Sequence, residues 1–166
     1  MEAGSVQAIV RALNQAGVRY LVAGGLAVVA HGYVRFTKDI DLVLALEEAN
    51  TRRALAALKQ LGYRPMVPVP IEDFADAAKR RRWADEKNAT VFPLYSDDHR
   101  LTPVELFVEE PFDFERAHAD GLREEIAPGI EAVFVGLTDL IAMKRRAGRP
   151  EDLIDIAQLE LINPTQ

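Results

Sequence analysis

Residues 20–46, YLVAGGLAVVAHGYVRFTKDIDLVLAL, contain the pattern that decides the fold. The β-rich stretch at residues 18–24 predicts a strand that ends on two adjacent glycines. The apolar residues 26–33 predict a short helix, and residues 39–46 predict a second strand. We therefore expect a strand, a glycine turn, a helix and a strand in succession.

The second strand carries two carboxylates, Asp39 and Asp41, separated by Ile40. Successive side chains of a strand project to opposite faces, so both carboxylates lie on one face and Ile40 on the other. At about 6 Å and an effective dielectric constant of about 20, the two charges repel each other by about 3 kcal/mol. A divalent cation offsets this repulsion, and magnesium prefers carboxylate, water and phosphate oxygens. For an isolated D-x-D pattern, the alternative is a solvated strand end without function.

Gly24 and Gly25 precede these carboxylates, at the expected turn from strand into helix. Backbone amides in such a turn, together with a helix N-terminus, can receive a phosphate group. A glycine pair alone is weak support, but combined with the carboxylate pair it predicts a site for a nucleoside triphosphate and its magnesium ion. Arg35 and Thr37 either contact phosphate or shape the turn, and Thr37 is the better functional candidate.

The composition is that of a globular protein, and we expect one domain over residues 1–166. No segment approaches the roughly 18 to 20 apolar residues that span a bilayer. Residues 1–17 predict an amphipathic helix rather than a signal peptide, so we expect a cytoplasmic protein with no membrane partner. The net charge of −6 argues against broad binding to nucleic acid, although it leaves room for a local basic groove.

The metal-ligand types available to the chain are limited, because it contains no cysteine. This excludes disulfides and thiolate metal sites and leaves oxygen and imidazole ligands. The three histidines, His31, His99 and His118, have no spacing suited to a metal site, and we interpret them as structural or surface residues.

Further helices and strands are predicted outside residues 20–46. We expect helices at 5–17, 47–63, 72–87, 139–147 and 151–162, and strands at 89–96, 103–108 and 131–135. Ser5 and Thr138 are the expected N-caps of the first helix and of the helix before the last. The first two of these strands are candidates for a hairpin, and residues 112–130 are expected to be polar and partly helical. The prediction is an α/β (α+β) fold, with a small mixed sheet flanked by helices and a C-terminal helix pair.

The glycine pair at 24–25, a spacer of 13 residues and DIDL at 39–42 resemble the signature of the nucleotidyltransferase superfamily typified by DNA polymerase beta. The segments RFTKD at 35–39 and LTDLIAMKRRAGRPEDLIDIAQL at 137–159 resemble more narrowly the abortive-infection type IV toxin-like nucleotidyltransferases. The resemblance extends over residues 18–162 and implies the nucleotidyltransferase fold.

The resemblance implies Gly24, Gly25, Thr37, Lys38 and Lys144 as nucleotide-binding residues. The family ordinarily has a serine in place of Gly25, and its hydroxyl touches the phosphates. That contact would have to come from backbone amides or elsewhere. Lys144 matches a family lysine thought to engage phosphate, and a surface lysine is the alternative.

Asp152 and Asp155 are three residues apart in the last expected helix and so share one helix face. An ion pair with Arg149 would fix the last two helices together, and we favour a structural role for Asp155. For Lys144, Arg149 and Asp152, functional and structural roles both stay open.

The superfamily completes its metal site with a third carboxylate on a neighbouring strand, and Glu105 is the best candidate. In PVELFV, residues 103–108, alternation places the three aliphatic side chains on one face and Glu105 beside Phe107 on the other. An acid at that position is costly without a partner. Glu109 and Glu110, at the expected strand end, are the alternatives.

The resemblance implies transfer of a nucleoside monophosphate by two magnesium ions, with manganese as an alternative. Asp39 and Asp41 would hold the ion on the triphosphate. Both residues, with Glu105, would bind a second ion that activates the acceptor hydroxyl for attack on the α-phosphorus. Glu105 is also the natural general base, and pyrophosphate would leave. Asp39, Asp41 and Glu105 are thus the expected catalytic and metal-binding residues.

The acceptor differs among relatives: a tRNA or other RNA end, a small molecule such as an antibiotic, or a tyrosine of a partner protein. A tRNA acceptor requires the basic segments KRRRW, residues 79–83, and KRRAGR, residues 144–149, to lie on the same rim as the carboxylates. Taken alone, the segment at residues 79–83 predicts a solvated helix face. The competing hypothesis is a weak or inactive member of the fold that binds a toxin or antitoxin partner.

Overall fold

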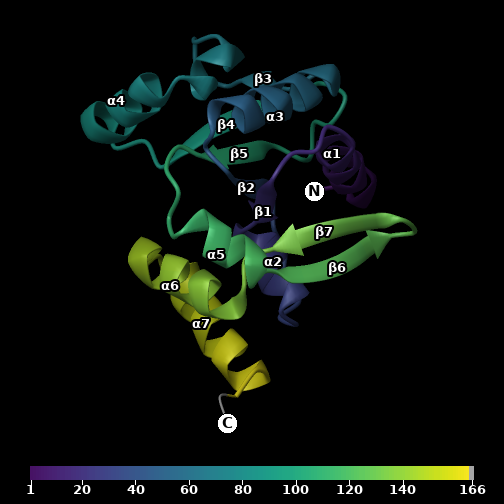
Figure 1. Cartoon of the computed structure of the whole chain (residues 1–166). Coiled ribbons are helices and arrows are strands. Elements are labelled where there is room, and N and C mark those ends of the chain that lie inside the picture. Colours follow the sequence, from purple (N-terminus) through teal and green to yellow (C-terminus); the bar gives the residue numbers. More distant parts are fainter. Residues whose placement is uncertain (165–166) are drawn as a thin grey trace.

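The computed structural model describes residues 1–164, and its strands form one mixed sheet (Figure 1). The strands are β1 (Tyr20–Val22), β2 (Ile40–Leu44), β3 (Arg64–Pro65), β4 (Val91–Tyr95), β5 (Val104–Phe107), β6 (Leu122–Ala127) and β7 (Ile130–Phe134). Their order across the sheet is β3-β4-β5-β2-β1-β7-β6. Strand β1 is parallel to β7 and β2 is parallel to β5, whereas the other neighbouring pairs are antiparallel. The predicted mixed sheet and the β4–β5 hairpin are confirmed.

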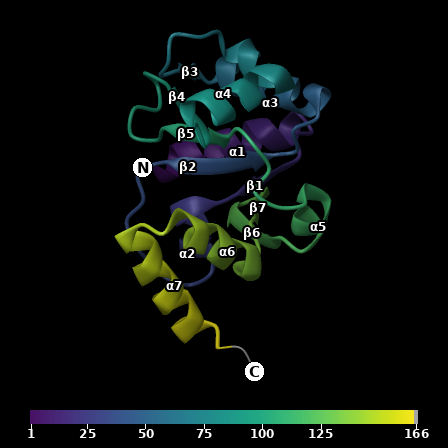
Figure 2. The ribbon, with the colours of Figure 1, turned by 90° about the vertical axis from the view of Figure 1, so that its left-hand side faces the viewer.

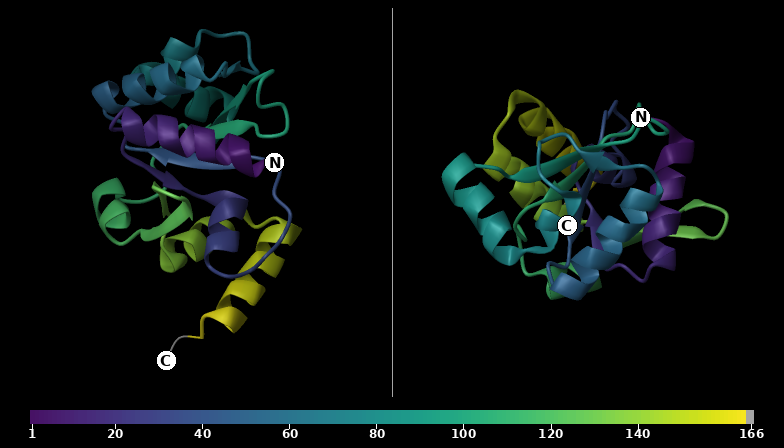
Figure 3. Two further views of the ribbon diagram at one scale, coloured as in Figure 1. Left: turned by 90° about the vertical axis from the view of Figure 1, so that its right-hand side faces the viewer. Right: turned by 90° about the horizontal axis from the view of Figure 1, so that it is seen from above.

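Helices flank this sheet. They are α1 (Ala3–Gln15), α2 (Gly24–Ala30), α3 (Glu48–Gln60), α4 (Ala77–Lys87), α5 (Phe114–Ala119), α6 (Leu137–Ala147) and α7 (Pro150–Ile162), with a 3₁₀ turn η1 (Ile71–Ala75) before α4. Helix α1 packs beside α3, and α6 packs beside α7 (Figures 2 and 3). Helices α3 and α4 lie at one end of the molecule and α6 and α7 at the other (Figures 1 and 2). Within residues 1–164, no helix is long and apolar enough to cross a membrane.

The strand-helix-strand unit predicted in residues 20–46 is present as β1, α2 and β2, at the centre of the sheet. All three residues of β1 are buried, as are four of the five residues of β2, and the remaining one is Asp41. The apolar side chains of these two strands therefore anchor the unit in the core, which leaves Asp41 at its surface.

Both predicted N-caps are wrong. Helix α1 begins two residues before Ser5, next to Glu2, whose N–H donates to Thr102 Oγ1 at 3.0 Å. Helix α6 begins one residue before Thr138, directly after Gly136. In each case the chain reaches a helical conformation earlier than the hydroxyl residue, which then lies in the first turn.

The helix predicted at residues 72–87 is interrupted at Asp76. Residues up to Ala75 form η1, and Asp76 then accepts hydrogen bonds from the backbone N–H groups of Ala78 and Lys79, at 2.8 and 3.2 Å. A side chain that binds these N–H groups is an N-cap, so it starts α4 as a separate helix.

Strand β6 is missing from the sequence-based prediction, which expects residues 112–130 to be polar and partly helical. The helical part is confirmed as α5, but Leu122–Ala127 pairs with β7 at the edge of the sheet. Its central residues, at positions 123–125, are exposed. An edge strand with little burial on either face lacks the apolar alternation by which strands are recognised.

Candidate active site

Strands β2 and β5 bring two acids together that are far apart in the sequence. The strands are parallel, with Asp41 paired to Glu105 and Leu42 paired to Leu106. Leu42 and Leu106 are completely buried, whereas Asp41 and Glu105 are half-buried. Paired residues of neighbouring strands project to the same face, so the two carboxyl groups are neighbours on the face opposite the core. The alternation predicted around Glu105 is confirmed.

Above this face lies a cavity of about 1090 Å³. It is lined by every residue that the sequence predicts for the site: Gly24, Gly25, Thr37, Lys38, Asp39, Asp41, Glu105 and Lys144. Its walls come from the loop before β2, from β2 and β5, from the end of α4, and from α6 and the start of α7. The structure therefore gathers the whole predicted set around one hollow.

Burial and neighbouring negative charge raise the pKa of two carboxyl groups in the cavity, those of Asp41 and Glu105. Burial raises the pKa of Asp41 to about 7, with further upward contributions from the charges of Asp39 and Glu105 that exceed the opposing effect of Lys144 and Arg149. Burial and Asp39 also raise the pKa of Glu105, against the opposing effects of Arg149 and of a hydrogen bond with Asp41. The cavity thus holds negative charge that the protein itself compensates only in part.

Gly24 is required by a close approach to Asp41. Its φ of +58° is in the left-handed region, and a Cβ at this position would lie only 1.8 Å from Asp41 Oδ2. Any side chain here would displace the carboxylate, so glycine is the residue that lets α2 begin directly against the acid.

Gly25 is explained by Thr37. A Cβ on Gly25 would lie 2.4 Å from Thr37 Oγ1 and 2.7 Å from Thr37 Cβ. The serine of the family signature therefore has no room in this chain. The space that its side chain would need is filled by another hydroxyl, that of Thr37.

Lys144 is neither a surface residue nor free to bind phosphate as it stands. It is buried, and its Nζ lies 2.9 Å from Asp152 Oδ1 and 2.7 Å from Asp155 Oδ2. The surface alternative is therefore wrong. The two carboxylates instead join α6 to α7, the role that the sequence suggests for Asp155.

Two arginines complete this network around the same acids. Arg149 Nε donates to Asp152 Oδ2 at 2.8 Å, as expected from their spacing. Arg35 Nη2 donates to Asp155 Oδ2 at 2.8 Å, and its Nε lies 2.7 Å from Asp155 Oδ1 without the alignment of a hydrogen bond. Arg35 thereby ties the loop before β2 to α7, a contact that nothing in the local sequence indicates.

The pKa of Asp152 shows how fully these charges are matched. Burial pushes this pKa upward, but the hydrogen bonds from Arg149 and Lys144 together outweigh burial and lower it to about 2. The negative charge of Asp152 is thus compensated by neighbouring positive charges, unlike the charges of Asp41 and Glu105 in the cavity.

The basic segment at residues 79–83 is not a simple solvated face. Arg80 is buried, and its Nη1 donates to the Phe74 carbonyl at 2.6 Å. Lys79 pairs with Asp73 at 2.6 Å. The prediction of a solvated face fails at Arg80 because η1, which the sequence reading merges into the helix, packs against it.

The histidines fit the structural reading. His31 Nε2 lies 2.8 Å from the carbonyl oxygen of Val135, and His99 Nδ1 lies 2.9 Å from Ser5 Oγ. The ring of His118 stacks on Phe114 with centroids 5.5 Å apart.

The donor set in the cavity suits a hard cation, although no ion site is preformed. In the part of the chain that the structure describes, no three histidine, aspartate or glutamate side chains are grouped so as to hold a metal ion. Asp39, Asp41 and Glu105 nevertheless line one cavity and offer only carboxylate oxygens, the ligands that magnesium prefers. The raised pKa values of Asp41 and Glu105 fit a site that binds a cation.

The fold was compared with known proteins. No family model and no curated protein sequence matches the chain. Among solved structures, it is similar to the crystal structure of ANT(2″)-Ia in complex with adenylyl-2″-tobramycin, with a TM-score of 0.58 and 16% identity over 95% of this chain and 86% of that one. It is also similar to the solution structure of the antibiotic-resistance factor ANT(2″)-Ia, with a TM-score of 0.62 and 14% identity over 96% of this chain and 82% of that one. The chain therefore has the nucleotidyltransferase fold that its glycine pair and DIDL motif predict.

Proposed function

We propose that this chain is a magnesium-dependent nucleotidyltransferase that moves a nucleoside monophosphate from its triphosphate to a hydroxyl group of a small, positively charged acceptor. The observation that carries the proposal is the parallel pairing of Asp41 with Glu105 at the floor of the cavity. The raised pKa values of these acids support a site built for a cation rather than for stability. The cytoplasm, where we expect the protein, fits this chemistry.

Asp39, Asp41 and Glu105 would hold the magnesium, with manganese as an alternative. When bound, the metal would neutralise phosphate charge and lower the pKa of the acceptor hydroxyl.

The triphosphate is held by the residues around the glycine pair. The hydroxyl of Thr37 takes the part that the family gives to a serine, because it occupies the space beside Gly25. Lys38 lines the cavity and makes no ion pair with any residue in the described range 1–164, so its charge is available to phosphate. Lys144 acts indirectly, by positioning α6 and α7 through Asp152 and Asp155.

Glu105 serves as the general base. Its raised pKa makes its carboxylate a better proton acceptor than an ordinary glutamate. As it takes the proton of the acceptor hydroxyl, the oxygen forms a bond to the α-phosphorus, the bond from that phosphorus to the bridging oxygen breaks, and pyrophosphate leaves.

The charge of the cavity wall supports a cationic acceptor. Glu109, Glu110 and Glu151 add carboxylates to the wall. Counting every lining residue, seven acids stand against five lysines and arginines, so the wall carries a small excess of negative charge. The neighbour ANT(2″)-Ia was solved in complex with adenylyl-2″-tobramycin, so this fold can hold an adenylylated small molecule.

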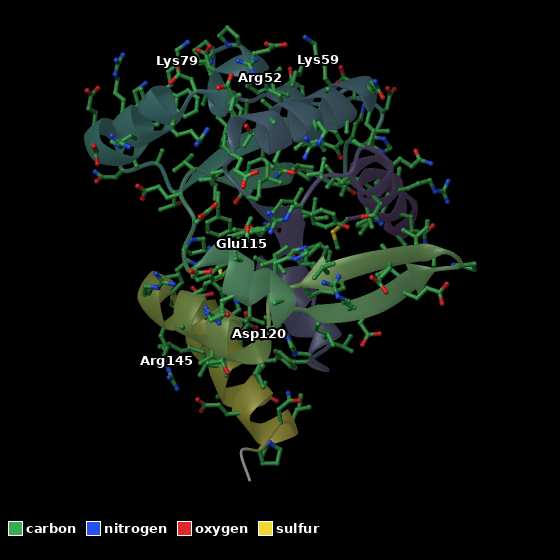
Figure 4. All side chains as sticks on the ribbon, viewed as in Figure 1. Arg52, Lys59, Lys79, Glu115, Asp120 and Arg145 are labelled. Carbon is green, nitrogen blue, oxygen red and sulfur yellow. The ribbon has the colours of Figure 1, made fainter. Side chains whose placement is uncertain are left out.

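RNA is less well supported, because the two basic segments do not share a rim. The cavity is lined by residues of 144–149 but by none of residues 79–83. Figure 4 shows Lys79 and Arg145, one from each segment, at opposite ends of the molecule. The net charge of −6 also gives no broad attraction to nucleic acid.

The test is a transfer assay with labelled nucleoside triphosphates and magnesium against three acceptor classes: amino-sugar antibiotics, bulk tRNA and a protein lysate. We expect label on an amino sugar, and none with Asp41→Asn. Label on tRNA or on a protein would show that the proposal of a small, positively charged acceptor is wrong, and would point to the toxin-antitoxin alternative. If no acceptor is labelled, and neither magnesium nor triphosphate raises the melting temperature of the wild type, the enzyme assignment is wrong.

A further inference from the structure

Helix α7 has apolar side chains on both its inward and its outward face. Its inward face combines the buried Ile156 and Leu159 with the acids Asp152 and Asp155, which the ion-pair network holds. Its outward face is apolar and carries Leu153, Ile154 and Leu161, which are between 56% and 74% exposed. Surface helices normally bury the apolar stripe and expose the charged one. The outward face of α7 therefore lacks the partner that its composition calls for.

The loop before β2 extends this apolar surface. It runs along α7, because a Cβ on Gly32 would meet Ile162 at 3.2 Å and Arg35 is bonded to Asp155. The residues on either side of Arg35, Val34 and Phe36, are 83% and 73% exposed. We refer to Val34, Phe36, Leu153, Ile154 and Leu161 as the outer patch. Large exposed apolar side chains near one another often mark an interaction site.

We propose that the outer patch is the contact between two copies of this chain, with their α7 helices antiparallel. Ile154 and Leu161 lie three and four residues on either side of Ala157, which is exposed on the same face. An antiparallel second copy places Ile154 against the partner's Leu161, with the small side chains of Ala157 where the helices cross. Such a patch is self-complementary, as a twofold interface requires.

The charges of α7 favour a second copy over a membrane surface. Residues 150–162 contain acids and no lysine or arginine. Helices that lie on membranes carry basic residues beside their apolar face, because lipid head groups are anionic. Helix α7 also lies at the outer edge of the molecule in Figures 2 and 3, where a second copy can reach it.

The expected dimer is small and borders the active site. One helix face and one loop place the interface at the low end of the size range, below about 1,200 Å², so the dimer should dissociate on dilution. Phe36 belongs both to the outer patch and to the lining of the cavity. The partner copy would therefore stand at the mouth of the site, although the dimer itself does not depend on the proposed function.

The first test measures molar mass by light scattering over about two orders of magnitude in concentration. We expect the mass to approach twice that of the chain at the highest concentration. Leu161→Glu should shift the protein to monomer at every concentration. Leu101→Glu is the matched control, because Leu101 is a leucine of similar exposure, 61%, outside the patch.

The second test uses the absence of cysteine from the chain. Ala157→Cys introduces a single thiol at the proposed crossing, and mild oxidation should yield a disulfide-linked dimer several-fold faster than with Leu101→Cys. Disulfides form only where Cβ atoms come within about 4 Å, so random collisions give the slower control rate. A wild type that is monomeric at all concentrations, with equal cross-linking of the two cysteine variants, would overturn the proposal. Binding of that monomer to anionic vesicles would assign the patch to a membrane instead.

Discussion

Two groups of acids, one in the cavity and one on α7, differ in what surrounds them. Asp152 and Asp155 lie among Lys144, Arg35 and Arg149, and the pKa of Asp152 falls to about 2. In the cavity, burial raises the pKa of Asp41 to about 7, and the charges of Asp39 and Glu105 add to the rise.

The contrast separates stability from function. A matched ion-pair network fixes helices in place, whereas unmatched acids oppose folding and are typical of functional sites. On this view the cavity acids serve function and the acids of α7 serve structure.

The largest effect is expected for Asp41→Asn. It removes a proposed metal ligand, so nucleotidyl transfer should fall by about a thousandfold or more, equivalent to at least 4 kcal/mol of transition-state stabilisation. The free energy of unfolding should stay the same or rise, because a charge repelled by Asp39 and Glu105 is lost. Transfer rates and urea unfolding measure the two quantities. If Asp41→Asn keeps its activity, or unfolds at a lower urea concentration than the wild type, the cavity acids do not differ in role from the acids of α7.

The next effect concerns Asp155→Asn. Breaking this buried pair leaves Lys144 and Arg35 with less compensation, and we expect a loss of about 3 kcal/mol in the free energy of unfolding. Glu160→Gln is the matched control on the same helix, because Glu160 pairs with Arg145 where both side chains are more than half exposed. Its cost should be below about 1 kcal/mol. Equal costs in the two variants would mean that the network does not hold α7.

The sequence predicts the cavity acids far better than it predicts the network. The D-x-D pattern and strand alternation identify Asp39, Asp41 and Glu105, because which face a side chain takes follows from local periodicity. That β2 and β5 are neighbours is a long-range pairing, for which only the resemblance to the superfamily argues. The network joins a loop and two helices, because Lys144 of α6 and Arg35 of the loop before β2 both bind Asp155 of α7. No local pattern encodes the meeting of these two basic side chains.

The same reasoning explains the other errors. Strand β6 has little apolar alternation because the sheet edge leaves it exposed. Arg80 lies in a basic run that is typical of a solvated helix, but packing against η1 buries it. Local patterns identify elements with one buried face, and they fail where the packing of another segment, or a place at the sheet edge, decides the burial.

A smaller effect should appear in the pH dependence of stability. The pKa of Asp41 is about 7 in the folded protein and near 3.8 when unperturbed, so the folded state binds more protons between these values. The free energy of unfolding should therefore fall by up to a few kcal/mol as the pH rises from about 4 to 7. Asp152 acts in the opposite sense, since its lowered pKa adds stability that is lost only as the pH falls from about 4 towards 2.

Urea unfolding between pH 4 and pH 8 checks this, with Asp41→Asn as the comparison. The variant should lose less stability across this range than the wild type. Magnesium should restore stability to the wild type at the alkaline end and leave the variant unchanged, because the cation replaces the proton. Parallel pH profiles of the two proteins would show that Asp41 does not carry the unmatched charge.

The smallest effect is expected where the phosphates meet the cavity. Thr37→Val removes the hydroxyl that we assign to phosphate, and KM for the triphosphate should rise about tenfold, as for a hydrogen bond of about 1.5 kcal/mol to a charged group. Thr37→Ser should have a KM close to that of the wild type.

A double variant tests the same assignment from the side of Gly25. Gly25→Ser alone should have reduced transfer activity, because its Cβ would lie 2.4 Å from Thr37 Oγ1. Adding Thr37→Gly to Gly25→Ser clears that space and supplies the hydroxyl from the position that the family uses. The double variant should therefore have a higher transfer activity than either single variant, Gly25→Ser or Thr37→Gly. If the losses of activity in Gly25→Ser and Thr37→Gly merely add in the double variant, the hydroxyl of Thr37 does not replace the missing serine, and the phosphate contact comes from the backbone.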